Sequence, residues 1–231
     1  NTIGLLRTAT RGGAGWQFIS QGEVPAAHLF YIQLALDTGC KWVQLRLKED
    51  GAGVNKEIIL KTGLAVSRLC ADYGALFILN DHVDLVGATG AHGVHLGLRD
   101  CDVKLARRIL GKDYIIGGTA NTQNDMMTRA LEGVDYIGLG PYRFTATKKN
   151  LSPVLGIEGN RNILGTSGSN RKVACPVYAI GGIVHGDLPL LFGTNIDGVA
   201  VCGWLTGQVG SPGGEMACQT GLNRPSLPDD Y

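Results

Sequence analysis

Threonine and lysine side chains are concentrated in one stretch of the chain, residues 138–153, which begins within an apolar run at 134–140. The stretch reads GLGPYRFTATKKNLSP and contains Arg143, Thr145, Thr147, Lys148 and Lys149. Lysine binds phosphate as a point charge, and threonine hydroxyls donate short hydrogen bonds to it. The stretch therefore predicts a site for an anionic ligand, and a solvated basic loop is the alternative interpretation.

A second polar group alternates with apolar residues in the sequence WVQLRLKE at residues 42–49. Period-two alternation places Gln44, Arg46 and Lys48 on one side of a strand and the apolar residues on the other. Two of these side chains are cationic, and burying a cation without a partner is costly. We therefore expect them to meet an anion, although an ordinary solvent-facing strand edge would give the same alternation.

Carboxylates follow the next two apolar runs. Asn80 and Asp81 come directly after the run at 75–79, and Asp100 ends the sequence HLGLRD. Neighbouring strands lie about 4.8 Å apart, so two carboxylates at adjacent strand ends can share one cation. Magnesium is commonly bound by one or two carboxylates together with substrate phosphate oxygens. The alternative for each aspartate alone is a helix cap, because a helical pattern follows both.

Small and hydroxyl residues end the later apolar runs. Thr119 lies in GGTANT, Gly182 in AIGGI, and Cys202 and Gly203 in AVCGW. Glycine allows the backbone to approach a phosphate closely. A phosphate site after the last two strands is typical of (β/α)8 barrels. Tight turns are the alternative explanation for the paired glycines.

These stretches belong to a regular alternation of short apolar strands and helical patterns. Strands are expected at 16–20, 41–47, 75–79, 93–96, 114–117, 134–138, 176–180 and 196–202. Helices are expected at 26–38, 55–73, 82–88, 103–110, 123–132, 157–165 and 185–192. Alternation without hairpin signals predicts parallel pairing, and eight units predict a single (β/α)8 barrel with its active site at the carboxyl ends of the strands. An open doubly wound sheet is the alternative.

Composition limits the class of protein. Apolar residues make up 44% of the 231 residues and charged residues 18%, which favours a globular fold with a large core. The net charge of +1 gives no reason to expect a nucleic-acid or membrane partner. The six cysteines form no CxxC pair, and the amino terminus has no convincing signal peptide, so we expect a cytoplasmic protein. We divide the chain into an N-terminal segment of uncertain structure at 1–15, a barrel at 16–207 and a flexible tail at 208–231.

Taken together, the motifs resemble those of the thiamine-phosphate synthase family, within the thiamine-phosphate synthase and thiazole tautomerase superfamily. The resemblance runs from about Phe18 to Gly203 and rests on VQLRLKE, ILNDHVDLV, GAHGVHLGLRD, IIGGTANT, DYIGLGPYRFTATKKNLSPVLGIEG, CPVYAIGGI and DGVAVCG. It implies a barrel transferase that couples 4-amino-5-hydroxymethyl-2-methylpyrimidine diphosphate to a thiazole phosphate, or to its carboxylated form. The implied reaction is dissociative and releases pyrophosphate.

The resemblance also implies roles for individual residues. It assigns the pyrimidine diphosphate to Gln44, Arg46, Lys48, Asn80, Thr119 and Lys148, with Arg46, Lys48, Thr119 and Lys148 contributing to catalysis. It assigns Mg2+ to Asp81 and Asp100. It assigns the thiazole phosphate to Thr145, Ala146, Thr147, Gly182, Cys202 and Gly203. Arg143 and Lys149 receive no direct role.

Two other functions stay open at this point. A thiazole tautomerase would need an acid or base near the thiazole but no complete diphosphate and magnesium site. A non-catalytic barrel that binds phosphorylated ligands would need no reacting groups. Departures from the family pattern are Leu98, where many members have a polar residue, and Gly203, which replaces a frequent serine. The substrates are small molecules, and homo-oligomerisation is left open.

Overall fold

Eight parallel strands close into a barrel in the computed structural model, which describes residues 6, 15–49, 53–144, 153–165 and 172–205. Each strand pairs with the next, and the last pairs with the first. They are β1 (Gly15–Ile19), β2 (Trp42–Leu45), β3 (Leu76–Asn80), β4 (Gly93–Leu96), β5 (Ile115–Ala120), β6 (Tyr136–Leu139), β7 (Val177–Ile180) and β8 (Gly198–Val201). The predicted (β/α)8 barrel is thus confirmed, and the open doubly wound sheet is excluded.

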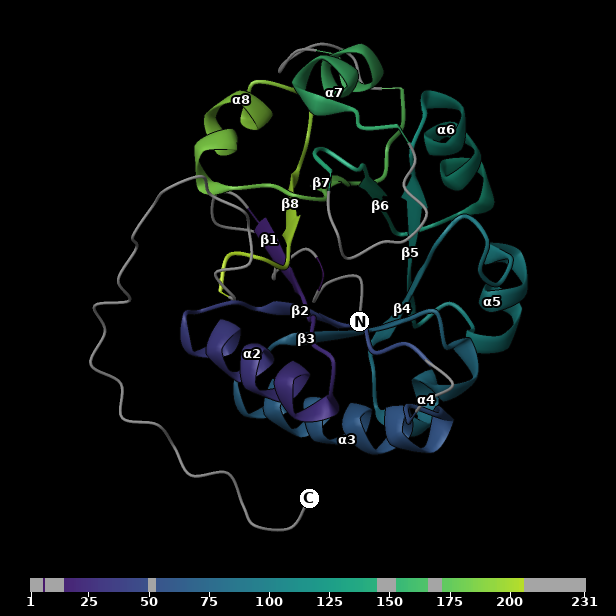
Figure 1. Ribbon diagram of the computed structural model, residues 1–231. Helices are drawn as coiled ribbons and strands as arrows, with labels where there is room; N and C mark the ends of the chain where they lie inside the picture. The colour runs from purple at the N-terminus through teal and green to yellow at the C-terminus, as the bar shows by residue number, and fades with distance from the viewer. Residues whose placement is uncertain (1–5, 7–14, 50–52, 145–152, 166–171, 206–231) are drawn as a thin grey trace.

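Helices surround the strands, as Figure 1 shows. They are α2 (Pro25–Asp37), α3 (Lys56–Asp72), α4 (Val86–Thr89), α5 (Val103–Leu110), α6 (Gln123–Glu132), α7 (Gly156–Leu164) and α8 (Leu188–Phe192). Two 3-10 turns, η1 (Val83–Leu85) and η2 (His185–Asp187), precede α4 and α8. Side-chain caps fix several starts; for example, Asn55 accepts the N–H of Ile58 at the beginning of α3.

Several predicted elements differ in their bounds from those observed, among them β2, β6 and the helix expected at 82–88. β2 ends at Leu45, two residues early, because the N–H of Arg46 donates to the Ser20 hydroxyl instead of to a neighbouring strand. β6 starts at Tyr136, because the N–H of Val134 still bonds to the last turn of α6. The helix expected at 82–88 is the short turn η1 followed by the single turn of α4.

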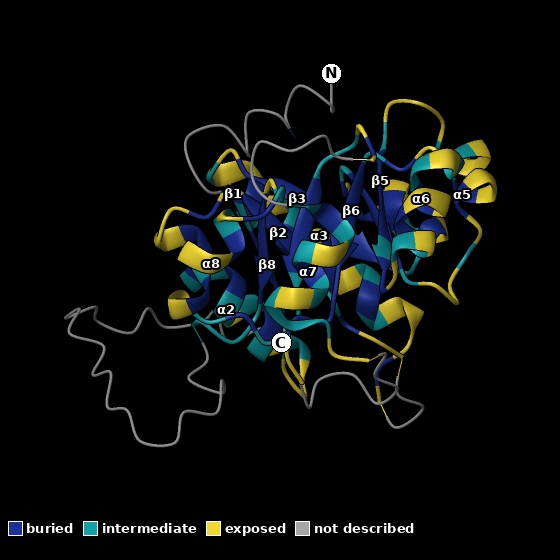
Figure 2. Cartoon of the chain, turned by 90° about the horizontal axis from the view of Figure 1, so that it is seen from above, coloured by how far each residue is buried: buried dark blue, intermediate teal, exposed yellow. Residues whose placement is uncertain are grey.

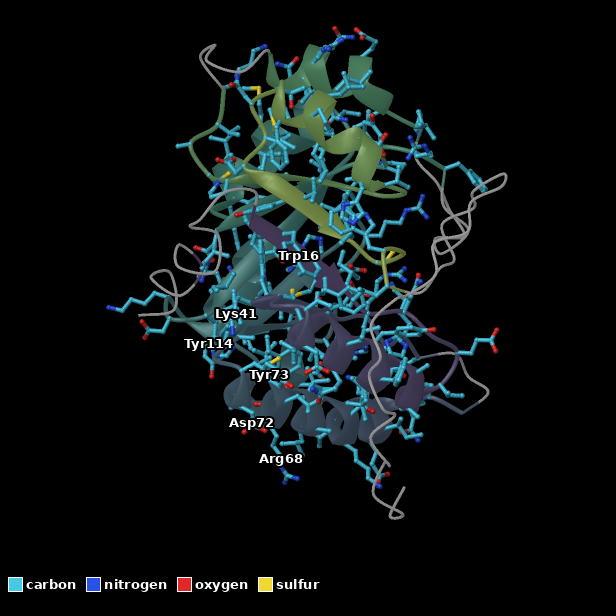
Figure 3. All side chains as sticks on the ribbon, turned by 90° about the vertical axis from the view of Figure 1, so that its left-hand side faces the viewer. Trp16, Lys41, Arg68, Asp72, Tyr73 and Tyr114 are labelled. Carbon is cyan, nitrogen blue, oxygen red and sulfur yellow. The ribbon has the colours of Figure 1, made fainter. Side chains whose placement is uncertain are left out.

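The barrel interior is filled from its amino-terminal end by aromatic side chains. Trp42 meets Tyr136 and Tyr178 edge to face, with ring centroids 4.9 and 4.8 Å apart, and all three are buried. Leu6, also buried, belongs to this cluster. Lys41 and Tyr114, labelled in Figure 3, directly precede β2 and β5 and mark the same end of the barrel. We call this cluster the aromatic base.

A second apolar core lies between the strands and the helices, and it includes Phe18, Val43, Phe77 and Ile116. Figure 2 shows the strands in the buried colour, with exposed residues mainly on the helices and connecting loops. Within the described residues, none of the helices is long and apolar enough to cross a membrane. Apart from Leu6 and Gly15, the predicted segments at 1–15 and 208–231 lie outside the described residues.

Candidate active site

A layer of polar side chains lies above the aromatic base, toward the carboxyl ends of the strands. Gln44 on β2 donates its amide to the carbonyl oxygen of Asn80 on β3, at 2.9 Å. His95 on β4 contacts the Tyr136 hydroxyl through Nδ1 and the Thr119 hydroxyl through Nε2, each at 3.0 Å. Strand alternation explains why these residues share the interior, since each lies an even number of positions from an inward-facing residue of the base or its neighbours.

Two atoms of this layer are buried without a hydrogen-bond partner in the described part of the chain. They are Oε1 of Gln44 and Nδ2 of Asn80, one acceptor and one donor on side chains that already touch each other. Leaving such a buried group unpaired costs about 1–3 kcal/mol. A heterocycle with a neighbouring donor and acceptor would satisfy both atoms.

Charged groups lie at the rim, one step beyond the polar layer. Lys48 pairs with Asp81 at 2.8 Å, and Asp100 accepts the N–H of Gly97 at 2.5 Å. Burial, together with a hydrogen bond with Asp100, raises the pKa of Asp81 to about 6, although Lys48 acts in the opposite direction. Burial also favours the protonated form of Asp100, but the hydrogen bonds from Asp81 and Gly97 outweigh it and lower its pKa.

The protonation of each carboxyl group therefore depends on the other. Within the described residues, no group of three or more His, Cys, Asp or Glu side chains could hold a metal ion. Two carboxylates with open coordination positions nevertheless suit a hard divalent cation that takes its other oxygens from water and a phosphorylated ligand. The residues thus fit magnesium better than a metal that requires a complete protein cage.

Arg46 follows β2 and forms no ion pair with a carboxylate of the described residues. Its guanidinium is partly buried, and its charge is felt by the Cys202 thiol, whose pKa is raised chiefly by burial and lowered in part by Arg46. A partly buried cation without an acidic partner is an anion site by default. Arg46 therefore places a positive charge near the end of β8.

The backbone of Arg46 is held by a buried chain of hydrogen bonds. Its N–H donates to the Ser20 hydroxyl at 3.0 Å, and that hydroxyl lies 2.7 Å from Nδ1 of His28. Because Nε2 of His28 lies 3.2 Å from the Gly22 carbonyl, which can only accept, we assign the ring proton to Nε2. Burial lowers the pKa of His28 to about 4; the Gly22 carbonyl opposes this shift, and the charge of Arg46 adds to it.

Glycines shape the remaining side of the mouth. Gly181 and Gly182 follow β7 with φ of 95° and 67°, a conformation that other residues rarely adopt. Cys202 and Gly203 follow β8 beside them, since β7 and β8 are paired. This is the position at which (β/α)8 barrels usually bind phosphate.

Comparison with known proteins identifies the family. The family model described as thiamine monophosphate synthase matches residues 17–205. The chain belongs to this family. A thiamine-phosphate synthase of Phocaeicola vulgatus is 46% identical over 190 residues, which cover 82% of this chain and 88% of the relative. A thiamine-phosphate synthase of Flavobacterium psychrophilum is 45% identical over 190 residues, which cover 82% of this chain and 90% of that relative.

A solved structure agrees with the sequence relatives. The thiamine phosphate pyrophosphorylase from Pyrococcus furiosus has a TM-score of 0.68 and 28% sequence identity. The match covers 81% of this chain and 85% of that chain. The family is therefore supported by both sequence and fold.

The structure brings most of the predicted site residues of this family member to one end of the barrel. The described ones are Gln44, Arg46, Lys48, Asn80, Asp81, Asp100, Thr119, Gly182, Cys202 and Gly203. The other four, Thr145, Ala146, Thr147 and Lys148, lie outside the described residues.

Two histidines in and just before β4 make different kinds of contact. His92 accepts the N–H of Phe77 at 3.1 Å, which is the structural role expected from the sequence. His95 instead lies in the polar layer against Thr119, and sequence reasoning gave it no part in the site. The signal that could have found it is parity, because His95 is two residues from Gly93 and two from Gly97 on one strand.

Proposed function

We propose that this protein is a thiamine-phosphate synthase. It joins 4-amino-5-hydroxymethyl-2-methylpyrimidine diphosphate to 4-methyl-5-(2-phosphooxyethyl)thiazole, or its carboxylated form, and releases pyrophosphate. The observation that carries the proposal is the unpaired acceptor and donor of Gln44 and Asn80, one layer below the cations and carboxylates of the rim. An aminopyrimidine in the interior with its diphosphate at the rim matches this order of groups.

The pyrimidine half of the site then has a defined set of residues. The ring meets Gln44 and Asn80, with Thr119 at its side. The diphosphate meets Arg46, Lys48 and Lys148. Asp81 and Asp100 hold Mg2+, which, when bound, compensates the charge that develops on the departing pyrophosphate. The fit of this metal is supported by the geometry at Asp81, whose carboxylate already pairs with one cation, Lys48, at 2.8 Å and lies beside Asp100.

The thiazole half is assigned to the other side of the mouth. Backbone groups at Gly182, Cys202 and Gly203 bind its phosphate, together with Thr145, Ala146 and Thr147. This is supported by the left-handed backbone at Gly181 and Gly182, which exposes peptide groups where a phosphate can approach. Both substrates therefore occupy adjoining positions within one mouth.

The chemistry follows from where charge develops. The bond between the pyrimidine methylene carbon and the diphosphate oxygen breaks, and its electron pair leaves with pyrophosphate. The thiazole nitrogen then gives its lone pair to that carbon. Arg46, Lys48 and Lys148 stabilise the leaving group more strongly in the transition state than before it, because its charge grows. Holding both substrates face to face removes much of the entropic barrier.

One incubation tests the proposal. Purified protein receives both precursors and Mg2+, and thiamine phosphate and pyrophosphate are measured in parallel with a reaction that contains chelator. Equal amounts of both products, dependent on the metal, are expected. Folded protein that gives no product above the no-enzyme control would overturn the proposed synthase activity. Thiazole isomerisation alone would indicate a tautomerase. Saturable ligand binding without either reaction would indicate a non-catalytic binding barrel.

We also infer that the protein works in the reducing cytoplasm. The inference is supported by Cys40, Cys70, Cys101 and Cys202, which are free thiols among the described residues. Burial raises the pKa of Cys40 to about 11 and that of Cys70 to about 12, so both thiols stay protonated and unreactive.

A further inference from the structure

Two loop segments at the carboxyl end of the barrel pack backbone against backbone. Residues 141–144 follow β6, and residues 181–187 follow β7. The N–H of Tyr142 donates to the carbonyl of Ile180 at 2.8 Å, and the N–H of Arg143 donates to the carbonyl of Gly181 at 2.9 Å. The two segments therefore continue the strand pairing beyond the strands.

The glycines of the second segment make this approach possible. A Cβ atom on Gly182 would lie 2.8 Å from Cβ of Arg143, and one on Gly181 would lie 2.9 Å from Cβ of Pro141. Such separations are shorter than real Cβ contacts, and both glycines also have positive φ. Close approach and backbone conformation thus both require glycine.

The side chain of Arg143 crosses this contact. One guanidinium nitrogen donates to the Gly182 carbonyl at 2.5 Å and to Oδ2 of Asp187 at 2.8 Å. The other donates to Oδ1 of Asp187 at 2.9 Å. Oδ2 of Asp187 also accepts the N–H of Val184 at 2.8 Å, so one carboxylate ties both segments together. Such a two-bond arrangement is specific to arginine among the cationic side chains.

We propose that Arg143 is a positioning residue that, through Asp187, fixes the phosphate-binding backbone at Gly182. The inference rests on the proposed function, which assigns the thiazole phosphate to Gly182. A peptide unit is planar, so holding the Gly182 carbonyl also fixes the direction of the N–H of Ile183, which belongs to the same peptide unit. Glycine has the freest backbone of any residue, and an external clamp therefore matters more here than elsewhere.

Arg143 itself is not expected to contact either substrate. Its guanidinium is already engaged by one carbonyl and by both oxygens of a carboxylate. Asp187 keeps its charge, because the hydrogen bonds from Arg143 and Val184 outweigh the effect of burial and lower its pKa. The effect on substrate must therefore pass through the backbone of residues 181–184.

The chain offers a matched control at the opposite end of the barrel. Arg107 pairs with Asp135 at 2.7 Å and donates to the Tyr114 carbonyl at 2.6 Å. Asp135 in turn accepts the N–H of Ile116 at 2.8 Å. Arg107 thus also links a carboxylate to a backbone carbonyl, but it does so at the amino-terminal end of the strands, because Tyr114 directly precedes β5.

Steady-state kinetics on four variants test the clamp. R143M and D187N are each expected to raise the KM for the thiazole phosphate about tenfold, as the loss of a charge-assisted hydrogen bond would. The KM for the pyrimidine diphosphate and kcat should stay within about twofold of wild type, which marks a loss of binding to one substrate. R143K should fall between wild type and R143M, since lysine keeps the charge but not the two-bond geometry. R107M should leave both KM values unchanged, whatever its melting temperature.

Other results would overturn the clamp. A wild-type KM for the thiazole phosphate in R143M would do so, as would equal rises in both KM values or the same rise in R107M. Calorimetric titration of the thiazole phosphate alone separates this failure from that of the proposed function. If wild-type protein shows no turnover, the proposed function fails; equal thiazole-phosphate affinities of wild type and R143M would then refute the clamp as well, and weaker binding by R143M would retain it.

Discussion

Acidification is expected to destabilise this protein through His28, which is buried between Ser20 and Gly22. Its pKa falls from the ordinary 6.5 to about 4, mainly because burial disfavours the charged ring. The unfolded chain therefore takes up this proton at a higher pH than the folded chain does. The stability linked to His28 is complete above pH 6.5 and is lost progressively as the pH falls toward 4.

The size of the effect follows from the shift in pKa. One pKa unit corresponds to about 1.4 kcal/mol, so the full loss below pH 4 is about 3 kcal/mol. At pH 5 the unfolded histidine is almost fully protonated and the folded one almost fully neutral, which gives a loss of about 2 kcal/mol. Burial also lowers the pKa values of His82 and His92, so their contributions have the same sign.

Urea unfolding at about pH 7.5 and pH 5 isolates the contribution of His28. The variant H28N keeps a hydrogen-bonding side chain beside Ser20 but cannot titrate in this range, so it should lose about 2 kcal/mol less on acidification than wild type. H185N is the control, because it makes the same substitution at an exposed histidine. An H28N variant that loses as much stability as wild type would refute the assignment of this histidine.

Three further changes test the site. D81N removes one of the two proposed metal ligands. It should therefore reduce Mg2+-dependent kcat/KM, measured by steady-state kinetics, by about 100-fold or more. It should change thiazole-phosphate affinity, measured by calorimetry, less than about threefold. Q44M should raise the KM for the pyrimidine diphosphate about tenfold by removing an acceptor to the ring. G182A should lower the free energy of unfolding by about 1–3 kcal/mol in urea titrations, since alanine meets both the positive φ and Cβ of Arg143.

Each of these three predictions can be contradicted by experiment. The control for D81N is D84N, because Asp84 also pairs with a lysine, Lys56 at 2.6 Å, but lies on the surface. Equal losses in turnover and thiazole-phosphate affinity would contradict the division of the site at Asp81. A Q44M variant with unchanged KM would remove Gln44 from the pyrimidine site. A fully stable G182A variant would show that the two loop segments separate at little cost.

The barrel and much of its mouth are visible in the sequence because strand alternation is local. Gln44 faces the interior as its parity with Trp42 requires, Asn80 is the last residue of β3, and Asp81 follows that strand. The position of Lys48 could not be predicted in this way, because β2 ends at Leu45 and side chains beyond it no longer alternate between the two faces of a strand. Its contact with Asp81 comes from a loop and could not be read from alternation.

Contacts between distant segments account for the rest. Arg143 meets Asp187 across 44 residues, and nothing near either residue in the sequence indicates the other. The interaction between Asp81 and Asp100 depends on burial and on how two separate loops approach each other. His95 was passed over because a single histidine in a strand is usually structural. Its place beside Thr119 depends on the pairing of β4 with β5.

The aromatic base has a kinetic consequence. Trp42, Tyr136 and Tyr178 are each at most 1% exposed, so whatever reaches Gln44 must arrive and depart through the rim at the other end. On the proposed function, the thiazole phosphate binds beside this route, so a thiazole bound at the mouth would narrow the way to Gln44. In a synthase of this shape the pyrimidine substrate is expected to bind first. The coupled product occupies the same deep position, so it is expected to leave only after pyrophosphate has dissociated from the mouth.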